Sequence, residues 1–264
     1  MKITPFSKNR ELIGDQLTRA RDHHLVVSTE HEIDLTEVLP VLARAQEEGF
    51  PVTLASYFIW STGQVVAAHP RLNRHCFHGW FRRYEVDFEE VSCTTVVARA
   101  GAAGEEILLP LLLRHVDTLS LRQVGSALRE AKTAPLESLP QLAAIEQVKK
   151  APLPLLRWFS YKARTDPRFY IRHFGTYGVS SNLARDHGPV GGHTFGNTGC
   201  AFLPGTLREV PRVVDGAIVP RWVLHTLFLA DHYVLDGADI SRGTEALRVR
   251  MEDPAVLERA LAGA

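Results

Sequence analysis

The order of helix-like and strand-like segments constrains the fold of this 264-residue chain more than any other feature. Helical spacing of apolar residues predicts helices at 7–22, 34–48, 53–68 and 120–132, with one or two more at the C-terminal end. Alternating, β-branched runs predict strands at 24–34, 90–100, 106–113, 175–181, 198–202, 212–214 and 221–230. The two types are mixed without strict β-α-β alternation. This order favours an α/β (α+β) two-layer sandwich with a mixed sheet over a doubly wound nucleotide-binding fold.

Turn and cap residues mark several element ends. Gly49 is expected to end the second helix, because a residue without Cβ adopts the left-handed conformation easily. The pair Asp215-Gly216 between two β-branched runs predicts a hairpin, and GAAG at 101–104 predicts another. Asp253-Pro254 is expected to begin the last helix.

Composition and charge exclude several classes of protein. Thirty basic and thirty acidic side chains give net charge +0, which removes the long-range field that nucleic-acid binders use to capture phosphates. The longest apolar run, 107–113, is far shorter than the roughly 20 residues of a membrane-spanning helix. The first residues lack the apolar core of a secretory signal. We therefore expect one cytoplasmic domain over 1–264, with no nucleic-acid partner and no membrane span.

Cysteine and histidine spacing gives no sign of a metal cofactor. Cys76, Cys93 and Cys200 are widely spaced and outside any CxxC pattern, so we expect small buried hydrophobic residues and no disulfide framework. His75 and His78 flank Cys76, but no second ligand pair lies at a recognised spacing. The sequence also contains neither GxGxxG nor GxxxxGK[ST], so no nucleotide site is predicted.

Residues 133–173 are the least regular part of the sequence, and aromatic and basic residues alternate there. Such a segment could grip a phosphate-bearing ligand or a carrier protein. The favoured interpretation is an amphipathic segment with aromatic side chains packed inward and basic side chains in solvent. The expected inward residues are Trp158, Phe159, Phe169 and Tyr170, and the expected solvated ones are Arg157, Lys162 and Arg164.

His232 and Asp236 stand four residues apart, after an apolar strand and before a glycine and a helix. A histidine at the mouth of such a strand is partly desolvated yet accessible, which suits a neutral imidazole acting as general base. Asp236 would either pair with a cation or cap the following helix. By itself the HxxxDG pattern is only moderately specific.

The context of this pattern resembles a known family. The segment ADHYVLDGADISRGTEAL, after the strand VPRWVLHTLFL, is similar to the C-terminal signature of the catalytic domain of 2-oxo acid dehydrogenase acyltransferases (E2), which shares the fold of chloramphenicol acetyltransferase. GTYGVSSNLA resembles the family's strand with the catalytic serine, and VVDGAIVPR resembles the hairpin before the histidine. LLPLLLRHVDTLSLRQV and TPFSKNRELIGDQL are similar to an internal segment and to the opening helix. The resemblance covers nearly the whole chain in the right order.

The resemblance implies roles for individual residues. His232 would remove a proton from a thiol, hydroxyl or amine acceptor, which then attacks the thioester of acyl-CoA, the co-substrate. Ser180 would donate a hydrogen bond to the oxyanion; Ser181 and Asn182 are alternatives, because adjacent residues of a strand face opposite ways. The family also implies a homotrimer with active sites between subunits, in which His232 of one chain faces Ser180 of the next.

The resemblance further implies that Arg10 pairs with Asp236 and steadies the histidine loop. Simpler interpretations remain, since Ser180 could be a strand serine bonded to backbone and Arg10 an exposed helix arginine. His187 and His193 lie in a glycine-rich loop. Whether they line the acceptor side is left open.

Three departures from the family bear on the substrate. The chain starts at the catalytic domain without a lipoyl or subunit-binding domain, Tyr233 stands where the family usually has arginine, and the 133–173 segment is longer than usual. They favour a stand-alone CoA-dependent acyltransferase for a small-molecule or carrier-bound acceptor. The alternatives are an E2 core served by a lipoyl group in trans and a non-catalytic trimeric scaffold or binding module. Condensation-type enzymes share HxxxDG but normally need a chain nearly twice as long.

Overall fold

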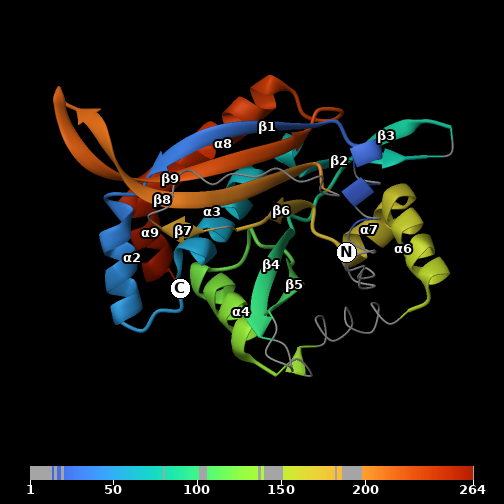
Figure 1. Cartoon of the computed structure of the whole chain (residues 1–264), viewed down its shortest axis with the longest axis horizontal. Coiled ribbons are helices and arrows are strands. Elements are labelled where there is room, and N and C mark those ends of the chain that lie inside the picture. The colour runs from blue at the N-terminus through green and yellow to red at the C-terminus, as the bar shows by residue number, and fades with distance from the viewer. Residues whose placement is uncertain are drawn as a thin grey trace, which may run out of the picture.

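A mixed sheet of seven strands runs through the part of the chain that the computed structural model describes (Figure 1). The described residues are 14, 17, 18, 21–79, 81–100, 106–135, 138–139, 151–181, 183–185 and 198–263. The strands of this sheet are β1 (Val26–Asp34), β4 (Cys93–Ala100), β5 (Glu106–Leu113), β6 (Tyr177–Val179), β7 (Ala184–Arg185), β8 (Cys200–Val214) and β9 (Ala217–Asp231).

The strands lie in the order β1-β9-β8-β6-β4-β5, with β7 beside β8. Strand β6 is parallel to both of its neighbours and β7 is parallel to β8, whereas the other pairs are antiparallel. A separate two-stranded sheet consists of β2 (Arg74–His78) and β3 (Arg83–Asp87).

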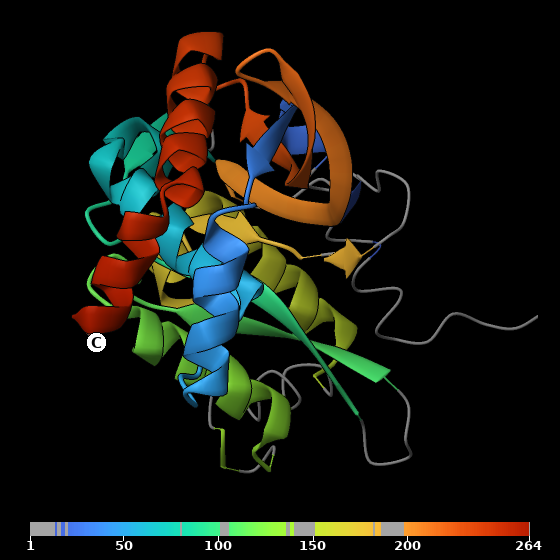
Figure 2. The same cartoon turned by 90° about the vertical axis from the view of Figure 1, so that its left-hand side faces the viewer.

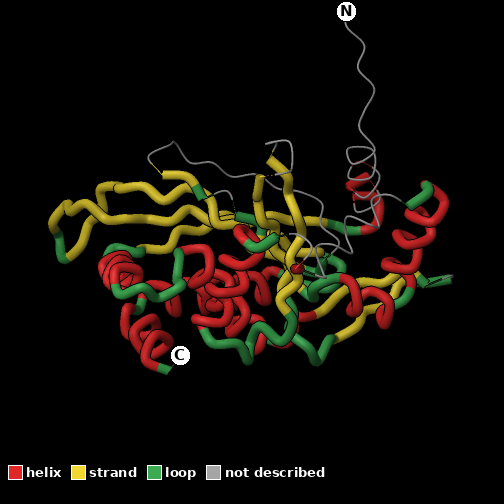
Figure 3. The backbone as a smooth tube through the Cα atoms, turned by 90° about the horizontal axis from the view of Figure 1, so that it is seen from below, coloured by secondary structure: helices red, strands yellow, loops and turns green. Residues whose placement is uncertain are grey.

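Helices form the second layer, on one side of the long strands (Figure 3). This layer contains α2 (Val38–Glu47), α3 (Leu54–Ala68), α4 (Leu121–Thr133), α8 (Gly237–Glu252) and α9 (Pro254–Ala262). Figure 2 shows α2 beside α9. The short η1 (Pro70–Asn73) leads into β2, and α6 (Leu153–Thr165) and α7 (Pro167–His173) lie at the β2–β3 end of the molecule. The predicted two-layer arrangement with a mixed sheet is confirmed.

Most element ends lie where the sequence places them. Thr53 and Ser120 cap α3 and α4, each accepting a hydrogen bond from the backbone N–H three residues later. Gly49 ends α2 with φ of +80°, and Gly216 has φ of +81° in the β8–β9 turn. The predicted helix at 7–22 lies largely outside the described residues.

Strand β8 differs from its prediction, because one continuous strand replaces two short ones. Pro204 and Pro211 do not end it: pairing with β9 continues on both sides of an irregularity between Pro204 and Leu207. Pro211 is the register partner of Pro220. Two residues that lack an N–H group therefore face each other, so neither removes a donor from an otherwise complete pair.

The segment 133–173 is more regular than expected where it is described, since α6 and α7 occupy 153–165 and 167–173. Tyr170 is fully buried, as the amphipathic interpretation predicts, but Trp158 is 50% exposed and contradicts it. The prediction failed for Trp158 because the buried residues of α6, Leu156 and Ala163, share one helix face and Trp158 lies off that face. Within the described residues no helix is long and apolar enough to cross a membrane.

Candidate active site

His232 follows the last residue of β9 and lies in the turn that leads to α8. Its backbone N–H donates to the carbonyl of Leu25 at 2.7 Å, which ties the turn to the segment before β1. Its ring Nδ1 lies 2.8 Å from the carbonyl oxygen of Leu235. Because a carbonyl oxygen only accepts, Nδ1 carries the proton, and in the neutral ring the lone pair is on Nε2. The side chain is exposed, so Nε2 is an accessible base.

The buried carboxylate of Asp231 supports this turn by hydrogen bonds. No sequence pattern indicated this role. Asp231 is 1% exposed. Its Oδ1 accepts from the backbone N–H groups of Leu25 and Tyr233, both at 3.1 Å, and its Oδ2 accepts from His24 Nδ1 at 2.6 Å. Burial raises the pKa of Asp231, but the hydrogen bonds from His24 and the backbone outweigh it and hold the pKa below its ordinary value. An ionised Asp231 thus holds Tyr233, which follows His232, and Leu25, whose carbonyl accepts from the His232 backbone N–H.

Asp236 caps α8, which was one of its two predicted roles. Its side chain accepts from the backbone N–H groups of Ala238 at 2.9 Å and Asp239 at 3.0 Å. The Asp236 backbone N–H donates to the side chain of Asp239 at 3.3 Å, which completes a capping box. Arg10 lies outside the described residues, so its ion pair with Asp236 stays a prediction.

Ser180 follows β6 and continues its alternation. Tyr177 and Val179 are buried, so Ser180 points to the opposite face and is exposed. Its backbone N–H donates to the carbonyl of Phe202 in β8 at 3.2 Å. Ser181 is exposed as well, and its hydroxyl accepts a hydrogen bond from the backbone N–H of Leu183 at 3.4 Å. Both serines therefore remain candidates for the oxyanion donor, while Asn182, His187 and His193 lie outside the described residues.

The sheet register separates Ser180 from His232 within one chain. Ser180 lies beside Phe202, which pairs with Phe228, whereas His232 lies four residues further along β9 and two strands away. At about 3.4 Å per residue and about 4.8 Å per strand, the separation is on the order of 15 Å. A general base and an oxyanion donor must both reach the same reacting group. The register therefore places Ser180 and His232 well apart within one chain.

Four histidines, from β2 and from the segment before β1, form a cluster beside Asp231, and His24 contacts its carboxylate. The ring centroids of His23 and His78 are 4.4 Å apart, and those of His24 and His75 are 5.3 Å apart. Burial, assisted by His24, lowers the pKa of His75 to about 3. Burial and then the charge of Arg164 lower the pKa of His23 to about 4. Among the described residues no group of three or more His, Cys, Asp or Glu side chains could hold a metal ion.

Gly199 lets the start of β8 lie close to β2, the strand that carries His75 and His78. A Cβ on Gly199 would lie 1.8 Å from the carbonyl oxygen of Arg74, so only glycine fits where the chain enters β8. The Gly199 carbonyl also accepts from the backbone N–H of Asp231 at 2.8 Å. The start of β8 therefore links β2, with His75, to the end of β9.

The buried His75 should make folding stability depend on pH. Its pKa is 6.5 in an ordinary setting and about 3 in the fold, so between these values the unfolded chain binds a proton that the folded chain does not. The free energy of unfolding therefore falls as the pH falls, by about 2 kcal/mol between pH 7 and pH 5 for one such histidine. His75→Phe keeps a ring against Tyr170 and should reduce the loss between the two pH values by about that amount. Urea unfolding at both pH values measures it, and an equal loss in wild type and variant would contradict the assignment.

The three cysteines are buried and free, as expected. Burial raises the pKa of Cys76 to about 11 and that of Cys93 to about 12, so neither is a reactive thiolate at neutral pH.

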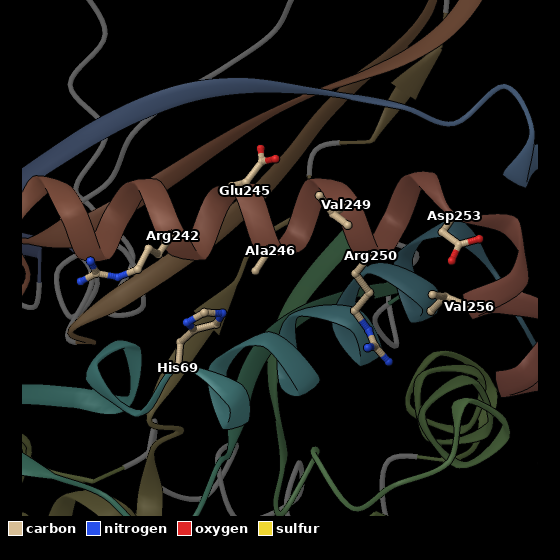
Figure 4. A pocket seen from close by; sticks show the side chains of 8 residues that line it. All are labelled: His69, Arg242, Glu245, Ala246, Val249, Arg250, Asp253 and Val256. Atoms are coloured by element: carbon tan, nitrogen blue, oxygen red, sulfur yellow. The ribbon is translucent and has the colours of Figure 1, made fainter.

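A surface groove elsewhere runs along α8 (Figure 4). His69, Arg242 and Arg250 are among its lining residues, but His232, Ser180 and Asp236 are not. The groove is therefore separate from the candidate active site.

Comparison with known proteins gives structural relatives only. No protein-family model matches the sequence, and no curated protein matches it significantly. The structure is similar to a probable dihydrolipoamide acetyltransferase from Listeria monocytogenes, with a TM-score of 0.67 and 17% identity over 96% of this chain and 95% of that one. It is similar to the cubic core of the pyruvate dehydrogenase multienzyme complex, with a TM-score of 0.66 and 18% identity over 97% of this chain and 94% of that one.

A third relative is dihydrolipoamide acetyltransferase from Azotobacter vinelandii, with a TM-score of 0.65 and 19% identity over 97% of this chain and 94% of that one. Its structure was studied for the role of a serine, a histidine and an asparagine in catalysis, and these lie 52 and then 4 positions apart in that protein. Ser180, His232 and Asp236 have the same spacing here. At these identities the comparisons establish the fold: this chain has the fold of the catalytic cores of the 2-oxo acid dehydrogenase acyltransferases (E2).

Proposed function

We propose that this protein is a CoA-dependent acyltransferase that moves an acyl group from CoA to a hydroxyl, amine or thiol acceptor. The observation that carries the proposal is the orientation of His232, whose Nδ1–H is held by the Leu235 carbonyl so that Nε2 is an exposed base. The E2-like fold and the matching spacing of serine, histidine and the residue four positions later support it.

The chemistry requires one proton to move twice. Nε2 of His232 takes the proton of the acceptor as its oxygen, nitrogen or sulfur forms a bond to the thioester carbon. The carbonyl oxygen becomes an oxyanion, which the Ser180 hydroxyl stabilises by donating a hydrogen bond. The intermediate then expels the sulfur of CoA, which receives the proton from His232. The products are the acylated acceptor and free CoA, and the imidazole returns to its neutral form.

The active site is assigned to the boundary between two chains. The separation of Ser180 and His232 on the order of 15 Å within one chain supports this assignment. We propose a homotrimer in which His232 of one chain meets Ser180 of the next. One structural relative belongs to a cubic core, and cubic symmetry contains threefold axes.

The favoured acceptor is a small molecule or a carrier-bound group, so that the protein acts alone. A second candidate function is transfer to a lipoyl group supplied in trans by another protein. The similarity over 95% of the chain of a probable dihydrolipoamide acetyltransferase favours that candidate.

Mass spectrometry of a small-molecule acceptor library, incubated with acetyl-CoA or longer acyl-CoAs, tests the proposal. Purified wild-type protein should form acylated products that His232→Ala protein does not form. A parallel reaction with free dihydrolipoamide separates the two candidate acceptors. Equal product yields from wild type and His232→Ala would show that the proposed chemistry is wrong, and no product from either protein in any reaction would favour a scaffold or binding module.

A further inference from the structure

We propose that Arg83, stacked on Tyr233, forms an anion-binding subsite beside His232 that binds a carboxylate or phosphate group of the acyl acceptor. This inference rests on the proposed function, because it assigns a substrate class to the same site. It favours an acceptor with a negative charge near its nucleophile over a neutral one.

Arg83 reaches the turn of the proposed base from a different part of the chain. It is the first residue of β3, and its guanidinium carbon lies 4.2 Å from the centre of the Tyr233 ring. Tyr233 directly follows His232 and is 47% exposed. Its backbone N–H is held by Asp231, so the ring that carries the guanidinium belongs to the same fixed turn as the base.

The guanidinium of Arg83 keeps its hydrogen-bonding edge available. Stacking on an aromatic ring uses the flat face of a guanidinium, whereas its five N–H donors point outward in the plane. Within the described chain Arg83 forms no ion pair with a carboxylate. Both carboxylates of this small sheet, Glu85 at 3.0 Å and Asp87 at 2.6 Å, pair with Arg74, which lies at the end of the sheet away from Arg83.

The surroundings of Arg83 add positive charge. Burial lowers the pKa of His78, and the charges of Arg83 and Arg164 lower it further, which places both guanidinium groups near this ring. Asp231 is enclosed by its own three donors, among them His24. An anion that enters from solvent therefore meets the charge of Arg83 and a planar set of donors that matches a carboxylate or phosphate.

The position of the subsite favours the acceptor over the phosphates of CoA. The guanidinium of Arg83 lies on the ring of Tyr233, the residue next to the proposed base, and this places the charge on the acceptor side of the turn. In acyl-CoA the long pantetheine arm separates the thioester from the nearest phosphate. A carboxylate or phosphate a few bonds from the acceptor's nucleophile fits the short span, whereas the CoA phosphates must lie further from His232.

Matched acceptors and matched variants test this inference. We compare 3-mercaptopropionate with its neutral amide as thiol acceptors of acetyl-CoA, and follow the acetylated products by chromatography. Arg83→Gln should lower kcat/KM for the carboxylate by about 10- to 100-fold, because it loses a charge-assisted hydrogen bond, and should leave kcat/KM for the amide unchanged. Arg82→Gln removes the same charge from the adjacent position and should keep the wild-type preference.

Two results would overturn the subsite. One is an equal loss of kcat/KM for both acceptors in Arg83→Gln. The other is a raised KM for acetyl-CoA with an unchanged preference between acceptors, which would assign the charge to the donor.

If wild type transfers to neither thiol, ligand-observed NMR with 3-mercaptopropionate alone tests whether the subsite binds the carboxylate. Binding that weakens in Arg83→Gln but not in Arg82→Gln would support the subsite while the catalytic proposal fails. Equal binding to all three proteins would contradict the subsite itself.

Discussion

Equal amounts of His232→Ala and Ser180→Ala chains, unfolded and refolded together, are expected to recover about one quarter of wild-type acyl transfer. Each variant alone should be far less active, by about 10²- to 10⁴-fold without the base and about 10²- to 10³-fold without the oxyanion donor. Recovery follows because each site takes its histidine from one chain and its serine from another. Half of the chains carry each intact residue, so random assembly gives an intact pair at about one site in four.

The controls for this experiment use the same refolding step. Each single variant refolded alone should stay inactive, and Ser181→Ala, at the neighbouring exposed serine, should keep wild-type activity. Size-exclusion chromatography with a tag on one variant shows whether mixed oligomers form. Mixed oligomers without recovery would place the two residues in independent roles. If Ser181→Ala is the inactive single variant and Ser180→Ala keeps wild-type activity, the oxyanion role moves by one position.

Asp231→Ala is expected to lower the free energy of unfolding by about 3–5 kcal/mol, because it leaves three donors of a buried hydrogen-bond network without their acceptor. The substitution leaves His24 without its acceptor in a buried setting and releases the N–H groups of Leu25 and Tyr233. Asp236→Ala removes a helix cap at the surface and should cost only about 1 kcal/mol. Urea unfolding at pH 7 measures both values.

The paired variant His24→Ala gives the control for this prediction. Combined with Asp231→Ala it should destabilise much less than the sum of the two single changes, because both remove the same contact. Additive losses, or a loss for Asp236→Ala as large as that for Asp231→Ala, would show that the carboxylate before the histidine does not hold the turn.

Local signals in the sequence account for most of the fold. Alternation of β-branched residues, Asp-Gly at the β8–β9 turn, and capping residues such as Thr53 and Ser120 act over a few residues, and these predictions agree with the structure. The continuity of β8 was not predictable in this way. A proline ordinarily indicates a strand end, and only the register shows that Pro211 meets Pro220.

In the candidate site, too, contacts between neighbours in sequence were predictable and contacts between distant segments were not. The HxxxDG pattern placed His232 at the end of a strand and Asp236 at the start of a helix, because both roles depend on neighbours in sequence. The support from Asp231 depends on His24, 207 residues away, and no local pattern reports a contact of that kind. The apposition of Arg83 and Tyr233 joins two distant segments as well, so it became visible only in the fold.

The ring of His232 is oriented by a main-chain atom, the Leu235 carbonyl, rather than by another side chain. The orientation of the imidazole therefore depends on the number of residues in the turn. The bond does not involve the side chains of Val234 and Leu235. Exchanging either for another apolar residue leaves the carbonyl where it is. Inserting or deleting a single residue there would displace it and free the imidazole to rotate.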